Sequence, residues 1–347
     1  MKKSLSNADV AELLAREAER SEGILPRAFK RAARSAFLWP EEASALLAEG
    51  RSLTELKSVG PFIARQMQAW LEKPPKVPPV PEIRRGFLTL ASARKILAAR
   101  PAWRTLLRGD LQMHTQWSDG SGSISQMAAE AENRGYTYIA ITDHSKGLKI
   151  AGGIDEAALR RQAKEIVATN RATARTGGKV TVLRSIEMNL NPRGEGDLEP
   201  LALRNLDLVL GSFHSSLRTT EDQTERYLRA LRNPHIQILG HPRGRIYNYR
   251  LGLKADWARV FGTAAKLDKA VEIDCYPDRQ DLSLSLLEIA QAEGVRISLG
   301  TDAHHPWQLG FIELGLAAAL KAAIPEGRII NFLPLPALHA WVRKLRR

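Results

Sequence analysis

The chain has 347 residues, of which 44% are hydrophobic, and it carries a formal net charge of +13 at pH 7. This length is enough for two domains or for one large barrel with an appendage. No apolar stretch approaches the ~20 residues that a membrane-spanning helix needs, and the first residues become charged before a signal-peptide core could form. We therefore expect a cytoplasmic protein.

The cysteine content limits which residues could bind a metal, and the charge distribution indicates the kind of partner. The single cysteine, Cys275, excludes an intrachain disulfide and a cysteine-based zinc knuckle, so any metal must be bound by histidines and carboxylates. Residues 1–108 hold 20 Lys and Arg against 11 Asp and Glu, whereas the remaining residues hold 31 against 27. A basic N-terminal third favours a polyanionic partner such as nucleic acid, although a merely solvated basic surface would show the same bias.

The N-terminal third is predicted to be helical. Apolar residues at helical spacing predict a helix over 7–18 with Asn7 as its N-cap, and a second helix over 26–37 with basic residues along one side. Residues 53–71 predict two short apolar helices joined by the turn at 58–61. Such a hairpin turns backbone N–H groups at a helix N-terminus toward a phosphate oxygen without reading any base.

The segment LTELKSVGPFIARQM resembles a helix-hairpin-helix DNA-binding motif, and residues 7–71 resemble the small N-terminal domain of family X DNA polymerases. The resemblance implies nucleic-acid contacts by Lys57, Val59, Gly60, Phe62 and Arg65. Where lyases of that family carry a Schiff-base lysine, this chain has Gln66, so we expect no lyase activity. A helical bundle used for protein contacts is the alternative interpretation.

A proline-rich segment separates this region from the rest. Five of the eight residues in 74–81 are proline, which removes backbone donors and favours an extended, stiff spacer. Residues 87–107 predict one or two short helices broken at Pro101. The predicted division is a helical domain over 1–73, a linker over 74–86, connecting helices over 87–107 and a large domain over 108–347.

Beyond residue 107, runs typical of β-strands alternate with helical runs, which predicts a parallel, barrel-like α/β fold with its chemistry at the carboxyl ends of the strands. The predicted strands cover 110–114, 138–142, 180–186, 206–211, 236–240, 270–273 and 296–300. Helices are predicted over 124–133, 156–174, 221–231 and 282–292.

Acidic or imidazole side chains follow six of the seven predicted strands. They are His114, Asp119, His144, Glu187, His214, His241, Asp302 and His304. One such residue is more often a capped turn or a satisfied core group than a ligand, but the recurrence favours a metal centre. Together they could hold two or three divalent ions of the Zn²⁺, Mn²⁺ or Fe²⁺ type, and without a cation the carboxylates would repel one another.

The ordered motifs GDLQMHTQWSDG, AITDHS, SIEM, GSFH, GHP and GTDAH resemble those of the PHP (polymerase and histidinol phosphatase) domain, in the branch attached to family X polymerases. The resemblance spans about residues 108–340 and implies a distorted, TIM-like (β/α)7 barrel with a trinuclear site. It implies the same eight residues as ligands, with Glu187 bridging two ions. The family's first motif is commonly His-x-His, so Gln112 is expected to be a weak ligand at a loosely filled or vacant position.

The implied chemistry is metal-assisted hydrolysis of a phosphoester, in which the ions make hydroxide available and nearby cations stabilise charge on the phosphoryl oxygens. Beside Glu187, the predicted catalytic residues are Lys146, Arg243 and Arg245, with Arg218 and Arg279 as further candidates. For each cation, a solvated loop charge is the alternative. Cys275 is expected to be a small buried filler, and no role is assigned to the remaining three histidines, His235, His305 and His339.

Between the helical segment and the PHP-like segment there is no room for a polymerase palm, so we expect no DNA synthesis. Three functional hypotheses remain open. The first is a nuclease or 3′-end-processing phosphoesterase of DNA repair, such as a 3′–5′ exonuclease. The second is a small-molecule phosphatase of the histidinol-phosphatase type, and the third is a non-catalytic DNA-binding scaffold. The native metal and the oligomeric state are not predicted.

Overall fold

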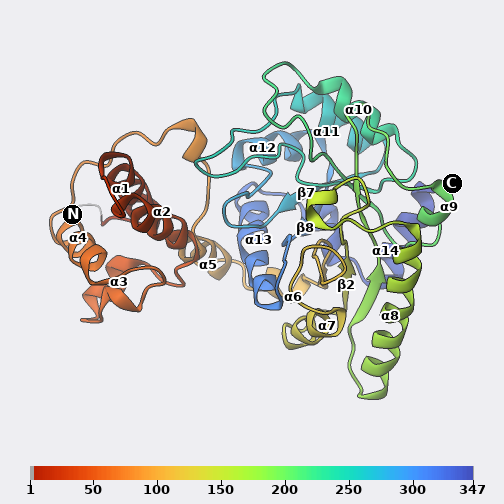
Figure 1. Cartoon of the computed structure of the whole chain (residues 1–347), viewed down its shortest axis with the longest axis horizontal. Helices are drawn as coiled ribbons and strands as arrows, with labels where there is room; N and C mark the ends of the chain where they lie inside the picture. The colour runs from red at the N-terminus through yellow and green to blue at the C-terminus, as the bar shows by residue number, and fades with distance from the viewer. Residues whose placement is uncertain (1–3, 347) are drawn as a thin grey trace.

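The computed structural model describes residues 4–346, which fall into a small helical unit at the N-terminus and a larger α/β barrel (Figure 1). The two ends of the chain lie on opposite sides of the molecule (Figure 1). The predicted division into domains remains a proposal, and residues 1–3 and 347 of its outer ranges lie outside the described part. None of the helices in residues 4–346 combines the length and apolar character that a bilayer crossing requires.

The helical unit contains α1 (Asn7–Arg20), α2 (Leu25–Ser35), α3 (Ala43–Ala48) and α4 (Pro61–Glu72). The predicted N-cap of α1 is wrong, because Ser6 caps the helix through a reciprocal capping box with Asp9. Asn7 is buried instead. Its side chain donates to the carbonyl of Glu41 at 2.8 Å and accepts from the amide of Ala43 at 2.8 Å, which fixes α1 to the start of α3.

The predicted pair of helices in 53–71 is only half correct. Its first member is the 3₁₀ turn η2 (Leu53–Glu55), which stops because Leu56 already has an extended backbone. Leu53, Leu56 and Val59 are all buried in the core of the helical unit, so this segment is held by its apolar side chains rather than by helix propagation. The second member is α4, whose N-cap, Gly60, offers no side-chain bond to the first turn.

Arg84, near the C-terminal end of the linker, contacts both the helical unit and the barrel. Arg84, in the turn η3 (Glu82–Arg84), is buried and donates to both carboxylate oxygens of Glu12 at 2.8 Å, and also to Asn248 of the barrel at 3.0 Å. Helices α5 (Leu90–Ala98) and α6 (Ala102–Leu106) then flank Pro101, as predicted for 87–107.

Every strand of the barrel pairs in parallel with its neighbour in space. The strands are β1 (Gly109–Asp110), β2 (Tyr138–Ile141), β3 (Thr181–Arg184), β4 (Glu187–Asn189), β5 (Leu210–Ser212), β6 (Ile238–Leu239), β7 (Ala270–Asp274) and β8 (Arg296–Gly300). They form one sheet in the order β1-β2-β3 and another in the order β4 to β8.

Backbone hydrogen bonds join the two sheets into a ring. β3 and β4 are separated by two residues, and the amide of Ser145, beyond β2, donates to the carbonyl of Glu187 in β4 at 3.1 Å. On the other side, the amide of Leu111 donates to the carbonyl of Leu299 in β8 at 3.3 Å, and the amide of His114 donates to the carbonyl of Ala303 beyond β8 at 2.8 Å. With β3 and β4 counted as one bent strand, the predicted distorted (β/α)7 barrel is confirmed.

Strand boundaries differ most from the prediction at two places: β1 ends at Asp110 rather than at 114, and the strand predicted from 206 starts later. The segment from residue 206 is largely buried, but the strand ladder starts only at Leu210. At position 207 the Asp side chain takes the place of a backbone acceptor. The Asp207 carboxylate accepts from the backbone amide of Arg184 at 2.9 Å and from its guanidinium at 3.1 Å. The Asp207 carboxylate therefore satisfies the backbone N–H of Arg184, which would otherwise donate to a carbonyl of the neighbouring strand.

Helices surround the barrel strands (Figure 1). They are α7 (Ile124–Asn133), α8 (Glu156–Arg175), α9 (Pro200–Leu203), α10 (Thr224–Arg232), α11 (Trp257–Lys266), α12 (Leu284–Glu293), α13 (Ile312–Lys321) and α14 (Leu335–Leu345). The four predicted helices correspond to α7, α8, α10 and α12 within three residues at each end. Helix α13 was not predicted because seven of its ten residues are buried, which hides the amphipathic period.

The apolar core is divided so that one end of the barrel stays free for polar groups. A large cluster lies between the strands and the surrounding helices. A smaller one joins side chains inside the barrel, such as Leu111 and Leu210, to Leu338 and Trp341 of α14, so α14 closes one end. The loop after β6 carries Tyr247 into the helical unit, where its ring lies 4.8 Å from that of Phe37.

Candidate metal centre

The eight residues predicted as ligands come together at the carboxyl ends of the barrel strands. His114 and Asp119 follow β1, His144 follows β2, and Glu187 begins β4. His214, His241 and the pair Asp302 and His304 follow β5, β6 and β8. Because parallel strands end at one rim, residues almost 200 positions apart in the chain become neighbours.

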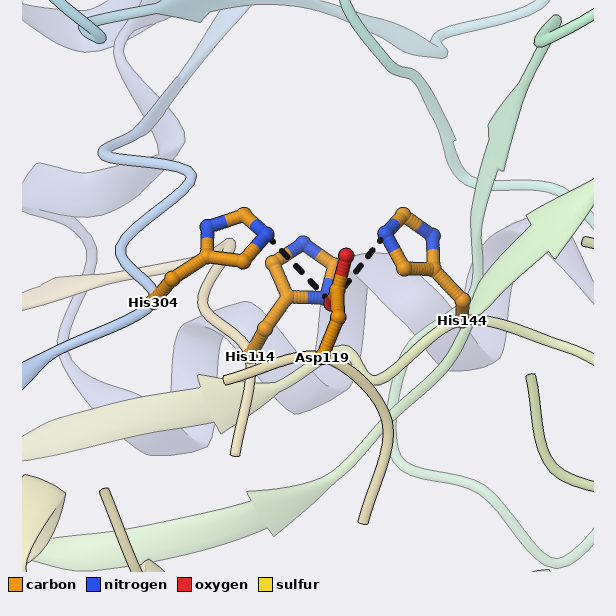
Figure 2. A group of neighbouring side chains, drawn as sticks. All are labelled: His114, Asp119, His144 and His304. Atoms are coloured by element: carbon orange, nitrogen blue, oxygen red, sulfur yellow. Dashed lines mark ion pairs between the residues drawn. The ribbon is translucent and has the colours of Figure 1, made fainter. Parts of the chain in front are cut away.

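A first set of ligands surrounds Asp119 (Figure 2). Its Oδ1 lies 3.3 Å from Nε2 of His304, 3.6 Å from Nε2 of His144 and 3.9 Å from Nδ1 of His114. The rings of His114 and His304 are stacked at 4.5 Å. Asp119 and His304 keep 35% and 28% of their side chains exposed, so this set faces solvent.

A second set surrounds the buried carboxylate of Glu187. Its Oε2 lies 2.9 Å from Nδ1 of His144, and its Oε1 lies 3.3 Å from Nε2 of His214 and 2.6 Å from Nε2 of His241. His144 belongs to both sets, since one ring nitrogen faces Glu187 and the other faces Asp119. Two neighbouring positions for a cation therefore share one imidazole.

The residues present fit divalent cations. Both ring nitrogens of His114, Nδ1 of His144 and Oε2 of Glu187 are buried without a hydrogen-bond partner within the described residues. Leaving such groups unsatisfied in the interior costs ~1–3 kcal/mol each. Imidazole and carboxylate together suit Zn²⁺, Mn²⁺ or Fe²⁺, so an ion on these atoms would satisfy several of them at once.

The electrostatics of the cluster support this interpretation. Burial alone would raise the pKa of Glu187, but the histidines around it, His144 first, lower that pKa well below its usual value. Burial lowers the pKa of His144, yet Glu187 and Asp119 raise it to about 10. Without a metal the carboxylates therefore draw a proton onto His144, and a divalent cation would supply the same positive charge in its place.

The neighbouring Asp143 has a supporting position. Its buried carboxylate accepts from the amide and hydroxyl of Thr115 at 2.7 and 2.6 Å and from the amide of Gln162 at 2.6 Å. It also accepts from Ser118 at 2.5 Å. Asp143 thus holds the loop between His114 and Asp119 in place.

Strand β7, for which no ligand was predicted, also carries buried acids. Glu272 accepts from the backbone amide of His241 at 2.8 Å, and Asp274 accepts from the amide of Tyr276 at 2.7 Å. Both side chains are fully buried. The sequence did contain a signal, because a Glu and an Asp interrupt the apolar run AVEID at alternate positions.

The predicted catalytic cations lie in three different surroundings. Lys146 is part-exposed and pairs with Glu156 at 2.7 Å, and that hydrogen bond raises its pKa. Arg245 is buried and donates to four backbone carbonyls, including those of Gly86 and Arg279, so its donors are already occupied. Arg243 has only a 3.8 Å approach to an exposed Glu82. Of the three, Arg243 has the most freedom to meet a substrate.

The predicted nucleic-acid-binding residues are mostly exposed on the helical unit. Lys57, Gly60, Phe62 and Arg65 are exposed, whereas the Val59 side chain is buried, which leaves only its backbone for a contact. The ammonium of Lys57 lies 5.1 Å from the ring centroid of Trp307, which is half exposed. Trp307 comes three residues after His304, so the hairpin lies directly beside a loop of the metal centre.

An α/β barrel with clustered histidines and carboxylates at the carboxyl ends of its strands has the architecture of a metal-dependent barrel enzyme. The chain belongs to the PHP domain family, whose model matches residues 110–301. It is 36% identical over 239 residues to DNA polymerase/3′-5′ exonuclease PolX of Bacillus subtilis, a match that covers 69% of this chain and 41% of that relative. The chain thus spans about two fifths of that protein's length.

Other relatives are named as phosphatases. A protein of Thermoanaerobacter sp. (strain X514) with the name "Probable phosphatase" is 27% identical over 228 residues, covering 64% of this chain and 89% of the relative. Among solved structures, the histidinol phosphate phosphatase of Lactococcus lactis, complexed with zinc, L-histidinol and phosphate, has a TM-score of 0.46 and 17% identity over 63% of this chain and 94% of its own. Family membership and the two relatives from B. subtilis and Thermoanaerobacter confirm the prediction of a metal-dependent phosphoesterase at the level of enzyme class.

Proposed function

We propose that this chain cleaves phosphoester bonds of nucleic acid near a 3′ end, as a 3′–5′ exonuclease or 3′-end-processing enzyme of DNA repair. One observation carries the substrate class: Lys57, next to the exposed hairpin, lies over Trp307 beside the metal-centre loop. A strand bound along Gly60 and Arg65 would therefore run directly toward the cluster. The excess of basic residues in the N-terminal third also favours a nucleic-acid strand that approaches the metal centre from the helical unit.

The proposed ligands are His114, Asp119, His144 and His304 for one ion, and His144, Glu187 and His214 for a second, with His241 adjacent. Bound there, divalent ions supply positive charge to the phosphoryl oxygens and lower the pKa of water toward ~7. Glu187 keeps the imidazoles of His144, His214 and His241 turned inward. The exposed edges of Asp119 and His304 leave that side open to a phosphate group.

Cations of the chain itself would complete the site. Arg243 lies two residues beyond His241, and Arg279 lies 3.3 Å from Asp302, with 32% of its side chain exposed. Both can meet a non-bridging phosphate oxygen, where a fixed positive charge stabilises the transition state. Arg245 is proposed to hold the linker against the barrel, and Lys146 to hold the loop after β2, each through the contacts described above.

The small-molecule phosphatase hypothesis keeps one specific support, since the relatives named as phosphatases match along most of their own length. The scaffold hypothesis is set aside because the enzyme class is confirmed.

Hydrolysis assays separate these hypotheses. The full chain is dialysed into Mn²⁺ and incubated with 5′-labelled single-stranded DNA and, separately, with p-nitrophenyl phosphate. His214→Ala tests the centre, and His235→Ala is the matched control because His235 lies outside both ligand sets. The proposal expects shortening of the DNA that is lost in His214→Ala and kept in His235→Ala. Hydrolysis of p-nitrophenyl phosphate without any DNA shortening would instead favour the phosphatase.

A further inference from the structure

The loop after β7 brings a cation to the metal centre instead of a ligand. Arg279 places Nη1 3.3 Å from Oδ2 of Asp302 and Nε 3.9 Å from Oδ2 of Asp274. The loops after β1, β2, β5, β6 and β8 each contribute an acid or an imidazole to the cluster. At this one end, a guanidinium takes the place beside the carboxylates.

Each carboxylate oxygen of Asp302 faces a different neighbour. Its Oδ2 faces Arg279, and its Oδ1 lies 2.9 Å from Nε2 of His114. Two sets within the described residues bring three or more ligand atoms within 4.8 Å of one another, and Asp302 belongs to neither. The geometry around Asp302 is therefore that of an ion-paired carboxylate, unlike the geometry around Asp119 and Glu187.

Gln112 is turned to a different partner. With its amide oriented so that the nitrogen faces acceptors and the oxygen faces donors, the side-chain nitrogen of Gln112 donates to Oε1 and Oε2 of Glu272 at 2.7 and 3.0 Å. Gln112 is fully buried, so this contact has no competition from water. The contact with Glu272 fixes the side chain of Gln112, whose one possible ligand atom is a neutral carbonyl oxygen, a weaker ligand than imidazole.

We propose that the centre binds two divalent ions and that Arg279 supplies the fixed positive charge at Asp302 that a third ion would otherwise supply. The inference rests on the proposed function only in taking the cluster as a metal centre, and it is independent of the substrate. A divalent ion on Asp302 would lie beside the guanidinium, and the two positive charges would repel each other. Because the guanidinium is tethered to the chain, a divalent ion must displace it from Asp302 in order to bind there.

Metal counting tests this without any assay of hydrolysis. The full-length protein is saturated with Mn²⁺, dialysed against metal-free buffer, and analysed by mass spectrometry of the elements alongside its protein concentration. Titration calorimetry with Mn²⁺ gives an independent count. We expect two ions per wild-type chain, two in Gln112→His, and three in the double variant Gln112→His/Arg279→Ala. Arg243→Ala is the control for loss of a nearby arginine and should keep two.

Three ions in the wild type would overturn the proposal without reference to any variant. A third ion in Gln112→His alone would also overturn it, because Gln112 rather than Arg279 would then limit the number. If the double variant fails to fold, as judged by circular dichroism, Gln112→His/Arg279→Gln replaces it with the same expectation. A chain that binds two ions but cuts no nucleic acid would leave this inference intact while removing the proposed function.

Discussion

Nε2 of His241 lies 2.6 Å from Oε1 of Glu187, although 54 residues separate the two in the chain. The contact brings the end of β6 against the start of β4 at the rim of the barrel. Together with His144 and His214, it makes one buried carboxylate the centre of three imidazoles. Loss of this carboxylate should therefore affect the whole cluster.

Glu187→Gln removes that charge at nearly constant volume. We expect the bound metal to fall from two ions per chain to about one, because the ligand set around Asp119 does not contain Glu187. The hydrolysis rate should fall by about 10³-fold, the scale seen when a main source of transition-state stabilisation is lost. Elemental analysis and the DNA assay measure the two effects. His235→Ala should retain both, and a Glu187→Gln protein with full metal content would refute a central role for this side chain.

Metal removal should lower thermal stability because buried ligand atoms without partners are satisfied only by an ion. A ligand at 100 times its Kd adds ~2.7 kcal/mol to the folded state, which corresponds to a rise in Tm of about 5 °C in a chain of this size. Scanning calorimetry with EDTA and with Mn²⁺ checks the expectation. The shift should be smaller in Glu187→Gln. Equal shifts in both proteins would place the stabilising ion elsewhere.

Nucleic-acid affinity should depend on the exposed hairpin side. The double variant Lys57→Ala/Arg65→Ala is expected to bind single-stranded DNA ~10-fold more weakly and to lower the slope of log K against log salt by ~0.7 for each lost phosphate contact. Fluorescence anisotropy at several salt concentrations provides both values. Arg20→Ala, which removes an exposed cation of α1, is the matched control. An unchanged salt dependence in the double variant would argue against this surface.

Lys269 gives a pH-dependent stability outside the metal centre. Burial lowers its pKa from 10.5 to about 8, although its ammonium donates to the carbonyl of Asn233 at 2.5 Å. Between pH 8 and 10.5 the unfolded chain binds this proton and the folded chain does not, so the lysine favours folding more as the pH rises. Relative to Lys269→Met, the free energy of unfolding of the wild type should rise by up to ~3 kcal/mol across this window.

Urea unfolding of both proteins at pH 7, 8, 9 and 10 measures that difference, because other alkaline effects are common to the two. A constant difference across the series would mean that Lys269 titrates normally in the folded chain.

Arg84 should stabilise the junction between the helical unit and the barrel. Its guanidinium is almost fully buried against Glu12 and Asn248. Arg84→Met leaves the buried Glu12 with fewer partners, which should cost ~3 kcal/mol in unfolding free energy. Arg94→Ala breaks an exposed pair with Glu313 and should cost less than ~1 kcal/mol. Urea titrations compare the two, and equal costs would show that the Arg84 network adds nothing beyond a surface pair.

The sequence alone predicted that the acids and imidazoles of the cluster gather at one rim, because they recur where the parallel strands of the barrel end together. It also determined the seven-strand barrel and the helices with a clear amphipathic period. It placed the cap of α1 one residue late, since Ser6 and Asn7 are both capping residues. It also extended a helix over η2, whose apolar spacing of three fits a 3₁₀ turn as well as an α-helix.

Only the tertiary structure decided which charges meet. Nothing in the local pattern around Arg279 distinguishes a solvated loop cation from one held 3.3 Å from Asp302. The pairing of Gln112 with Glu272 and the insertion of Tyr247 into the helical unit likewise join segments more than a hundred residues apart. The periodicity of a sequence indicates which face of a helix or strand is buried. The partner of a buried polar group depends instead on how distant elements pack together, and no single stretch of sequence contains that information.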